Sequence, residues 1–290
     1  GIQGLMSASY KGLAGEALER EYNPRLAAPN FQAYLDAQAS RSAKTRDALT
    51  GSLDMRYGDG PLQTMDIFPA KTPNAPIHVF IHGGYWRGLD KNFYSYIAEP
   101  LVAAGATVAM LNYDLAPTLT IGGIVGQTAD AVRWLHANAR QIGGDPDRLY
   151  LSGHSAGAHL AAMMLARDWA AEGRPADIVK GVVAVSGVYE LEPVTMLKVN
   201  SEIGLTADEA ARNSLVANLP RPVCPILVAV GGGETPDWIR QSADFAKLCR
   251  ERGLTTDYWE IGRENHFSIC DRMGEARHPL VRAMLAQMGL

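Results

Sequence analysis

The alternation of hydrophobic and polar residues changes character early in the chain. Residues 8–50 place apolar side chains at helical spacing, for example Phe31 and Tyr34, and contain no strand-like run. Beyond them the apolar residues gather in short β-rich runs separated by Gly, Pro and Asn. The pattern predicts a helical segment over residues 1–50, forming part of a cap, and a sheet-containing domain over residues 51–290.

Short apolar runs and segments of helical periodicity alternate through this second part. Strands are expected over 54–57, 63–68, 77–82, 107–113, 149–152, 181–186, 226–231 and 256–261, and helices over 124–141, 156–171 and 237–252. The first two strands can form a hairpin closed around residues 58–60. Apolar strands that alternate with helices are typical of a buried parallel sheet. We therefore expect an α/β fold with a doubly wound, mostly parallel sheet and helices on both of its faces.

Residues 189–221 hold no expected strand, although strands lie on either side of them. Ligands bind at the carboxyl edge of the parallel strands in such folds. We expect this insertion to form a small lid over that edge of the sheet.

Composition and charge restrict the kind of partner. A formal net charge of -4 offers no basic surface to attract nucleic acid or an anionic membrane. Three cysteines at wide spacings form neither a disulfide framework nor a metal site, and no apolar window reaches the ~18 residues that span a bilayer. These features favour a cytoplasmic protein that acts on a small molecule, with a homodimer left open. Residues 1–5 precede Met6 and are expected to be a vector-derived remnant.

The segment 153–157 reads Gly-His-Ser-Ala-Gly and must turn the chain sharply from an expected strand into an expected helix. This is the setting of a nucleophile elbow, in which a strained serine needs neighbours with almost no side chain. Gly153 and Gly157 supply that room, and the helix N-terminus favours developing negative charge. Ser186 also follows a strand but has no matching second glycine. The pattern therefore predicts Ser155 as a nucleophile.

A second glycine pair follows an earlier strand, in the segment 82–86 with the sequence His-Gly-Gly-Tyr-Trp. Backbone N–H groups at the end of such a strand can bind an oxyanion together with the N–H of the residue after the nucleophile. The candidate donors are Gly83, Gly84, Tyr85 and Ala156. The side chains expected to line the substrate pocket are those of Tyr85, Trp86 and His154. The alternative is a plain turn whose two aromatic residues pack in the core.

The catalytic base is expected beyond the serine, because the acid and then the histidine follow the nucleophile when it stands on such an elbow. Of the histidines that follow the elbow and its helix, His266 and His278 remain. His266 comes directly after the last expected strand, at the carboxyl edge where the site forms. His278 precedes a proline and suits a helix cap. We therefore expect His266 to be the base.

Two carboxylates compete for the role of the acid in the loop after the strand 226–231, namely Glu234 and Asp237. Pro236 suits the first turn of the following helix, which would place Asp237 in that turn. Glu234 would stay in the loop that faces the site. We favour Glu234, which would hold His266 in the right tautomer.

These motifs together resemble the hormone-sensitive-lipase-like side of the α/β-hydrolase superfamily, and more narrowly the kynurenine formamidase family with its bacterial esterase relatives. The elbow and the Ala-His-Leu that follows it are similar to that family's elbow, and Tyr and Trp after two glycines resemble its oxyanion motif. Residues 234–242 resemble its acid loop, with Glu234 where the family carries Asp. The resemblance implies an α/β-hydrolase fold and hydrolysis of a small ester or formyl amide through an acyl-enzyme.

Three other functions stay open. The chain could be a short-chain carboxylesterase, or an amidase or imidase of another catabolic pathway. It could also be a non-catalytic binding protein on a hydrolase scaffold, although the presence of Ser155, Glu234 and His266 together argues against this. The mechanism that these three residues imply needs no metal and no organic cofactor.

Overall fold

The computed structural model describes residues 8–290, so the expectation for residues 1–5 lies outside the described residues. The described residues build an eight-stranded sheet of order β1-β2-β4-β3-β5-β6-β7-β8. The strands are β1 (Ser52–Arg56), β2 (Thr64–Phe68), β3 (Ala75–Ile81), β4 (Thr107–Leu111), β5 (Gly144–His154), β6 (Val182–Val185), β7 (Ile226–Gly231) and β8 (Thr256–Ile261). β1 and β2 form the expected hairpin, β2 is also antiparallel to β4, and the other neighbouring strands are parallel. The predicted mostly parallel sheet is confirmed.

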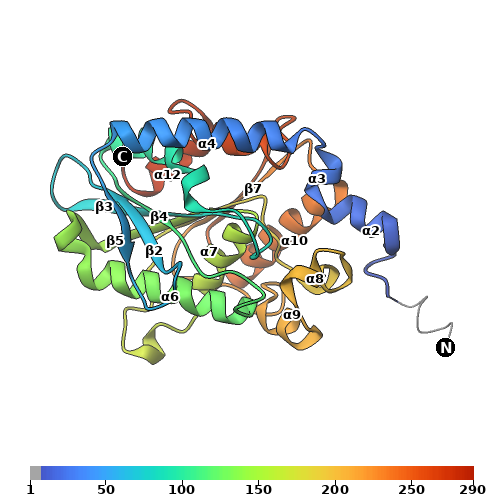
Figure 1. Cartoon of the computed structure of the whole chain (residues 1–290). Coiled ribbons are helices and arrows are strands. Elements are labelled where there is room, and N and C mark those ends of the chain that lie inside the picture. Colours follow the sequence, from blue (N-terminus) through green and yellow to red (C-terminus); the bar gives the residue numbers. More distant parts are fainter. Residues whose placement is uncertain (1–7) are drawn as a thin grey trace.

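Helices cover both faces of this sheet, as expected. In Figure 1, α4 (Phe31–Ala48) and α12 (Pro279–Gln287) lie above the sheet and α6 (Ile121–Asn138) lies below it. The other α-helices are α2 (Gly15–Tyr22), α3 (Pro24–Ala27), α5 (Ala98–Ala104), α7 (Ala156–Ala166), α8 (Asn200–Ile203), α9 (Ala207–Asn213), α10 (Pro236–Arg252) and α11 (Ser268–Arg272). Short 3-10 helices are η1 (Lys91–Phe93), η2 (Ser95–Ile97), η3 (Ala139–Ile142), η4 (Ala170–Glu172) and η5 (Glu192–Met196).

Two helices differ from the periodicity at one boundary each: α6 begins earlier than expected and α7 ends earlier. α6 begins earlier than expected because Thr120 caps it, accepting a hydrogen bond from the N–H of Gly123. α7 ends at Ala166, short of residue 171, because Arg167 takes an extended conformation with φ -75° and ψ 139°. Hydrophobic periodicity extends past that point because Trp169 folds back into the core and donates to the carbonyl of Met164 at 2.8 Å.

The central strand β3 explains why the sheet is apolar on both faces. All of its residues are buried. Ile77, Val79 and Ile81 pack in the core between the sheet and helices α6 and α7. Phe80 packs in the core on the opposite face, between the sheet and helices α5 and α12. Because successive side chains of a strand point to opposite faces, a strand covered by helices on both sides must be hydrophobic throughout.

The N-terminal helices and residues 189–221 meet at one end of the sheet. In Figure 1, α2 and α3 lie beside α8 and α10 on the right of the molecule. Polar contacts join them: the Thr235 hydroxyl donates to the carbonyl of Glu21 at 2.6 Å, and the N–H of Lys198 donates to Oε1 of Glu19 at 2.6 Å. These two segments, which we call the outer wall (residues 8–30 and 189–221), therefore stand over the carboxyl ends of the strands.

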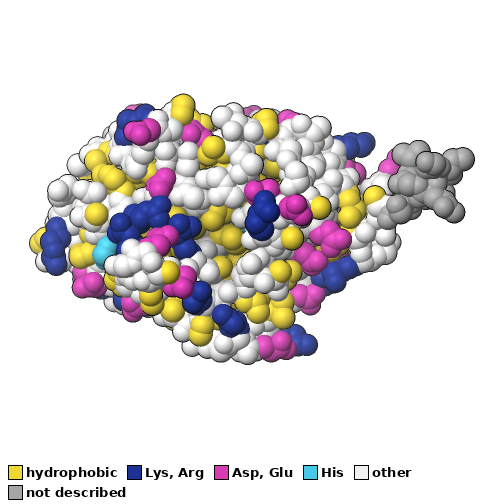
Figure 2. All heavy atoms as spheres, turned by 90° about the horizontal axis from the view of Figure 1, so that it is seen from below, with side chains coloured by type: hydrophobic (Ala, Val, Ile, Leu, Met, Phe, Trp, Pro, Cys, Tyr) yellow, Lys and Arg dark blue, Asp and Glu magenta, His cyan; other side chains and the backbone are white. Residues whose placement is uncertain are grey.

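On the face shown in Figure 2, several basic side chains gather left of the centre, and acidic side chains lie beside them. None of the helices within residues 8–290 is both long and apolar enough to cross a membrane.

Candidate active site

The turn between β5 and α7 has the geometry that the Gly-His-Ser-Ala-Gly segment predicts. Ser155 sits between the strand and the helix with φ 59° and ψ -120°, a conformation that few L-residues adopt. A Cβ on Gly157 would collide with the carbonyl oxygen of Ile81, and one on Gly153 would collide with the backbone of Gly157. Both glycines are therefore required by the close approach of neighbouring backbone, and together they hold Ser155 at the carboxyl end of β5.

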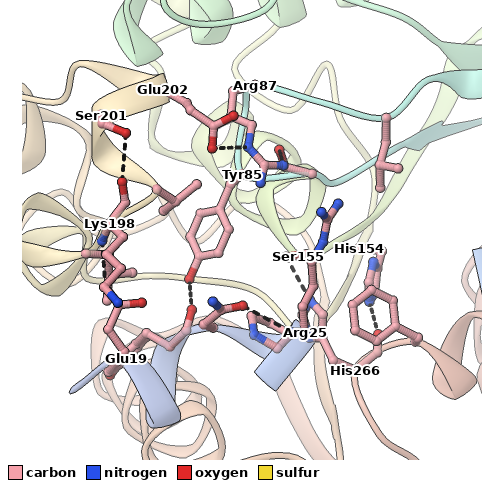
Figure 3. A pocket seen from close by; sticks show the side chains of 18 of the residues that line it. Glu19, Arg25, Tyr85, Arg87, His154, Ser155, Lys198, Ser201, Glu202 and His266 are labelled. Atoms are coloured by element: carbon pink, nitrogen blue, oxygen red, sulfur yellow. Dashed lines mark hydrogen bonds and ion pairs between the residues drawn. The ribbon is translucent and has the colours of Figure 1, made fainter. Parts of the chain in front are cut away.

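Three side chains from three different loops meet at this edge. The Oγ atom of Ser155 lies 3.0 Å from Nε2 of His266, and Nδ1 of His266 lies 2.6 Å from Oε1 of Glu234. Figure 3 shows Ser155 and His266 facing one another across the cavity floor. All three residues are buried. The structure thus brings together the serine, the histidine and the acid that the sequence singles out.

Glu234 is itself held by two further hydrogen bonds, both to Oε2. The hydroxyl of Ser186 donates to this oxygen at 2.5 Å and the N–H of Gly231 donates to it at 2.6 Å. Oε1 is therefore left for His266. The competing carboxylate, Asp237, lies in the first turn of α10 and forms an ion pair with Arg240 at 2.7 Å.

Ser186, which lacks the glycine spacing of a nucleophile elbow, instead binds the acid Glu234. It follows β6, it has φ 53°, and its N–H donates to the carbonyl of Ala229 in β7 at 2.7 Å. The only signal in the sequence is its place after a strand, because its partner Glu234 is set by the neighbouring strand β7.

The loop after β3 presents backbone N–H groups to the same edge. Gly84, Tyr85 and Trp86 have consecutive positive φ values of 108°, 51° and 58°, and the carbonyl of Gly84 accepts from the N–H of Gly88 at 3.1 Å. A Cβ on Gly83 would collide with the elbow at Ser155, so this loop packs directly on the turn. Within residues 8–290, no acceptor binds the N–H groups of the four expected donors, Gly83, Gly84, Tyr85 and Ala156. An N–H group without an acceptor at this edge can bind a developing oxyanion.

His82 stabilises the loop after β3 through its buried imidazole ring. Its Nδ1–H donates to the carbonyl of Gly83 at 2.6 Å, and its ring stacks on Tyr113 with 4.5 Å between centroids. Burial lowers the pKa of His82 to about 4, so the ring is neutral at physiological pH and acts as a fixed donor.

The side chains of the two aromatic residues after the glycines point to different places. Tyr85 lines the cavity beside Ser155, and its hydroxyl donates to the carbonyl of Tyr22 in the outer wall. Trp86, expected to line the pocket, is instead fully buried and donates from Nε1 to Nδ1 of His159 at 3.2 Å. Trp86 is thus a core residue, because the left-handed turn points successive side chains in different directions.

His154 lines the cavity next to the serine, as expected. Its Nε2–H donates to the backbone carbonyl of His266 at 2.7 Å. Burial, followed by the charge of His266, holds the pKa of His154 well below its usual range. The ring therefore stays neutral and fixes the main chain of His266.

The cavity has a volume of about 430 Å³, within the range of small-molecule sites. Its walls come from the outer wall, the loop after β3 and the elbow (Figure 3). The charged side chains that line it are Glu19, Arg25, Arg87, Lys198 and Glu202. No motif marks these five in the sequence. Residues 8–290 contain no group of three or more His, Cys, Asp or Glu side chains placed to hold a metal ion.

Known proteins resemble this chain in architecture and in sequence. The family profile of the alpha/beta hydrolase fold matches residues 78–266. The kynurenine formamidase of Danio rerio is 30% identical, over 97% of this chain and 99% of its own length, and that of Salmo salar is 31% identical, over 97% and 98%. The crystal structure of a proposed thioesterase from Silicibacter sp. has a TM-score of 0.80 at 28% identity, covering 91% of this chain and 97% of that one. The chain therefore belongs to the alpha/beta hydrolase fold family and is a homologue of the kynurenine formamidases, as its motifs predict.

Proposed function

We propose that this chain is a serine hydrolase that cleaves the formyl amide of an aromatic amine or a small carboxylic ester through an acyl-enzyme. The observation that carries the proposal is the continuous line of hydrogen bonds from Ser155 through His266 to Glu234, at 3.0 and 2.6 Å. This line ends at a cavity of about 430 Å³, large enough for a small aromatic substrate.

In the proposed mechanism Oγ of Ser155 attacks the substrate carbonyl while Nε2 of His266 takes its proton. The N–H groups of Gly84, Tyr85 and Ala156 would stabilise the oxyanion. His266 then gives the proton to the leaving amine or alcohol. A water molecule, deprotonated by the same histidine, then attacks the acyl-enzyme carbonyl. The bond from this carbonyl to Oγ of Ser155 breaks, His266 returns the proton to Oγ, and formate or another carboxylic acid leaves.

Glu234 has a supporting part in this mechanism. Its Oε1 accepts a hydrogen bond from the Nδ1–H of His266 and so fixes the tautomer in which Nε2 is the base. It also stabilises the imidazolium that forms after Ser155 loses its proton. The second carboxylate oxygen is bound by Ser186 and Gly231, which keeps the first oriented toward the histidine.

The names of the homologous proteins suggest which acyl group to test first. Proteins named kynurenine formamidase match this chain over almost its whole length, which supports a formyl amide of an aromatic amine as the substrate. A short-chain carboxylesterase, or an amidase or imidase, is the second candidate. The open N–H groups at Gly84 and Tyr85 are compatible with an ester as well, because they would bind the oxyanion of either substrate.

The test compares kcat/KM for N-formylkynurenine with kcat/KM for p-nitrophenyl acetate and p-nitrophenyl butyrate. We expect the formamide to be preferred, and an ester preference would make the chain a carboxylesterase. Ser155→Ala should lower kcat on all three by about 10⁴ or more with an unchanged fold by circular dichroism. A phosphonate that fails to label Ser155 in the unmodified protein would favour the non-catalytic binding protein.

Two broader predictions accompany this function. Cys224, Cys249 and Cys270 are free thiols, which supports a cytoplasmic location because reducing compartments keep thiols unpaired. A homodimer stays a prediction, and sedimentation equilibrium of the purified protein would test it.

A further inference from the structure

His154 precedes the nucleophile in the chain, and its ring borders the same cavity (Figure 3). The side chain is only 4% exposed. Its Nε2–H donates to the main-chain carbonyl of His266 at 2.7 Å, so the single proton of the neutral ring is on Nε2 and Nδ1 carries a lone pair. Nδ1 of His78 and Nε2 of His82 are sealed in the core, whereas Nδ1 of His154 is open to the cavity. No donor within residues 8–290 binds it.

The surroundings keep this lone pair available. Burial, followed by the charge of His266, holds the pKa of His154 well below its usual range, so Nδ1 does not take up a proton at neutral pH. A flipped ring would leave the carbonyl of His266 without its donor. His154 can therefore receive a hydrogen bond from a molecule in the cavity but cannot donate one to it.

The ring also lies close to the atom that protonates the leaving group. The ring centroids of His154 and His266 are 4.6 Å apart. Nε2 of His266 faces Oγ of Ser155 at 3.0 Å, and in the proposed mechanism it passes the proton of Ser155 to the leaving group. A leaving atom within hydrogen-bond distance of this Nε2 is thereby brought next to His154.

An amide and an ester place different demands on this position. The leaving nitrogen of a secondary amide keeps its own hydrogen. Once Ser155 has added to the carbonyl, the nitrogen becomes pyramidal, and its lone pair must face Nε2–H of His266 to receive the proton. Its own N–H then points toward the cavity wall, where it needs an acceptor as the C–N bond breaks and the amine leaves. An ester oxygen carries no hydrogen and gains nothing from such an acceptor.

We propose that Nδ1 of His154 accepts a hydrogen bond from the N–H of the scissile amide, and that His154 thereby sets the preference of this site for amides over esters. The inference rests on the proposed function and deepens it, because Ser155, His266 and Glu234 serve both kinds of substrate alike. Sites that bind a substrate N–H discriminate strongly against analogues that lack it. The group that is recognised is uncharged and belongs to the bond that is cleaved.

The experiment compares two uncharged substrates that differ at the leaving atom, formanilide and phenyl formate. The measured quantity is the ratio of their kcat/KM values, amide over ester. His154→Leu removes the acceptor and should lower this ratio about tenfold, while loss of the hydrogen bond to His266 lowers both kcat/KM values. His154→Gln keeps an oxygen that accepts and an N–H that donates, and should hold the ratio within about twofold of the unmodified protein.

His82→Gln is the matched control. His82 is also a buried, neutral ring that donates to a backbone carbonyl of the site, that of Gly83, but it does not line the cavity. Its replacement should slow both substrates and leave the ratio within about twofold, because both form the same oxyanion. An equal change of the ratio in His154→Leu and His82→Gln would mean that His154 only holds the main chain of His266, and it overturns the proposal.

A second measurement needs no variant and decides the matter even where His154→Leu does not fold. N-methylformanilide is an amide without an N–H, and its kcat/KM in the unmodified protein should be about tenfold or more below that of formanilide. An equal or higher value overturns the role of His154. Hydrolysis of phenyl formate reports on the proposed function separately. If phenyl formate is cleaved and formanilide is not, only the role of His154 fails; if Ser155→Ala cleaves phenyl formate as fast as the unmodified protein, the proposed function fails as well.

Discussion

The two sides of the cavity are built in different ways. The inner wall consists of the elbow, the oxyanion loop, Glu234 and His266, and its catalytic side chains are buried and fixed by short hydrogen bonds at the ends of strands. The outer wall presents Arg25, Lys198 and Glu202 from short helices or their flanks, and these side chains are exposed. The comparison shows that backbone geometry positions the Ser155, His266 and Glu234 side chains, whereas few backbone constraints hold the charged side chains of the outer wall.

Polar contacts attach the outer wall to the rest of the molecule. The hydroxyl of Tyr22 donates to Asp237, and Nη2 of Arg240 in α10 donates to the hydroxyl of Tyr10 at 2.9 Å. Apolar packing also contributes, because Tyr10, Leu18 and Tyr22 are buried. Changes in the inner wall should therefore affect stability and turnover strongly, and changes in the outer wall should affect mainly substrate affinity.

Acid should destabilise the inner wall most, because its supporting histidines are buried and neutral. Burial lowers the pKa of His78 to about 3 and those of His82 and His159 to about 4, and it holds that of His154 well below its usual range. The unfolded chain binds these protons near pH 6.5, whereas the folded chain does not. The free energy of unfolding should be highest and constant above pH 6.5. It should fall by about 1.4 kcal/mol per pH unit for each histidine as the pH drops toward 4.

Urea unfolding followed by circular dichroism at pH values from 8 to about 5 checks this. The midpoint should be constant at the alkaline end and drop steeply below about pH 6.5. A midpoint that is equal at both ends of the range would show that these rings gain protons without loss of the fold.

Gly157→Ala should be the most damaging single change in the inner wall. The added Cβ would collide with the carbonyl oxygen of Ile81 in the central strand, and backbone cannot move aside as a flexible side chain does. We expect a loss of about 3 kcal/mol or more, or failure to fold. Gly126→Ala in α6 is the matched control, because its Cβ would meet nothing within 4 Å and should stabilise the helix by about 0.5–1 kcal/mol. Similar unfolding midpoints for both variants would contradict this account.

The inner wall can be predicted from the sequence because its determinants are local. Glycines around Ser155, and again at 83 and 84, indicate a nucleophile elbow and an oxyanion loop when a strand precedes them, and the chain order of acid and histidine follows from the same fold. The exception is Ser186, whose role depends on β6 and β7 being neighbours in the sheet. That adjacency is a property of the topology and not of any short segment.

The outer wall could not be predicted in the same way. Arg25 lines the same cavity as Ser155 although the two residues are more than a hundred positions apart, and nothing near Arg25 in the chain indicates this. The sequence also does not indicate that Tyr85 lines the cavity and Trp86 lies in the core. Two adjacent aromatic residues give the same sequence pattern, and the left-handed backbone sets the direction of each side chain. Side-chain direction at irregular backbone is therefore where sequence patterns stop being informative.

Ser186→Ala sharpens the comparison within the inner wall. Losing one charge-assisted hydrogen bond to Glu234 should let the carboxylate rotate and lower kcat by about tenfold with little change in KM. Ser152→Ala is a matched control, since Ser152 is also buried but bonds to His78 at 2.6 Å, away from the acid. It should lose stability and keep its kcat. Equal effects of the two variants on kcat would mean that Ser186 is structural and does not position Glu234.

Tyr10→Phe gives the smallest expected effect and tests the outer wall directly. The Tyr10 hydroxyl donates to Glu190 and accepts from Arg240 at 2.9 Å, so it links the N-terminal segment to residues 189–221 and to α10. Its loss should cost about 1 kcal/mol in the free energy of unfolding and raise KM by about two- to threefold, while kcat stays the same. Tyr150→Phe is the control, because no partner within residues 8–290 binds that hydroxyl, and it should change neither KM nor kcat. A fall of kcat in Tyr10→Phe would contradict this separation of the two walls. It would mean that a change in the outer wall displaces Ser155 and His266, although Tyr10 contacts neither of them.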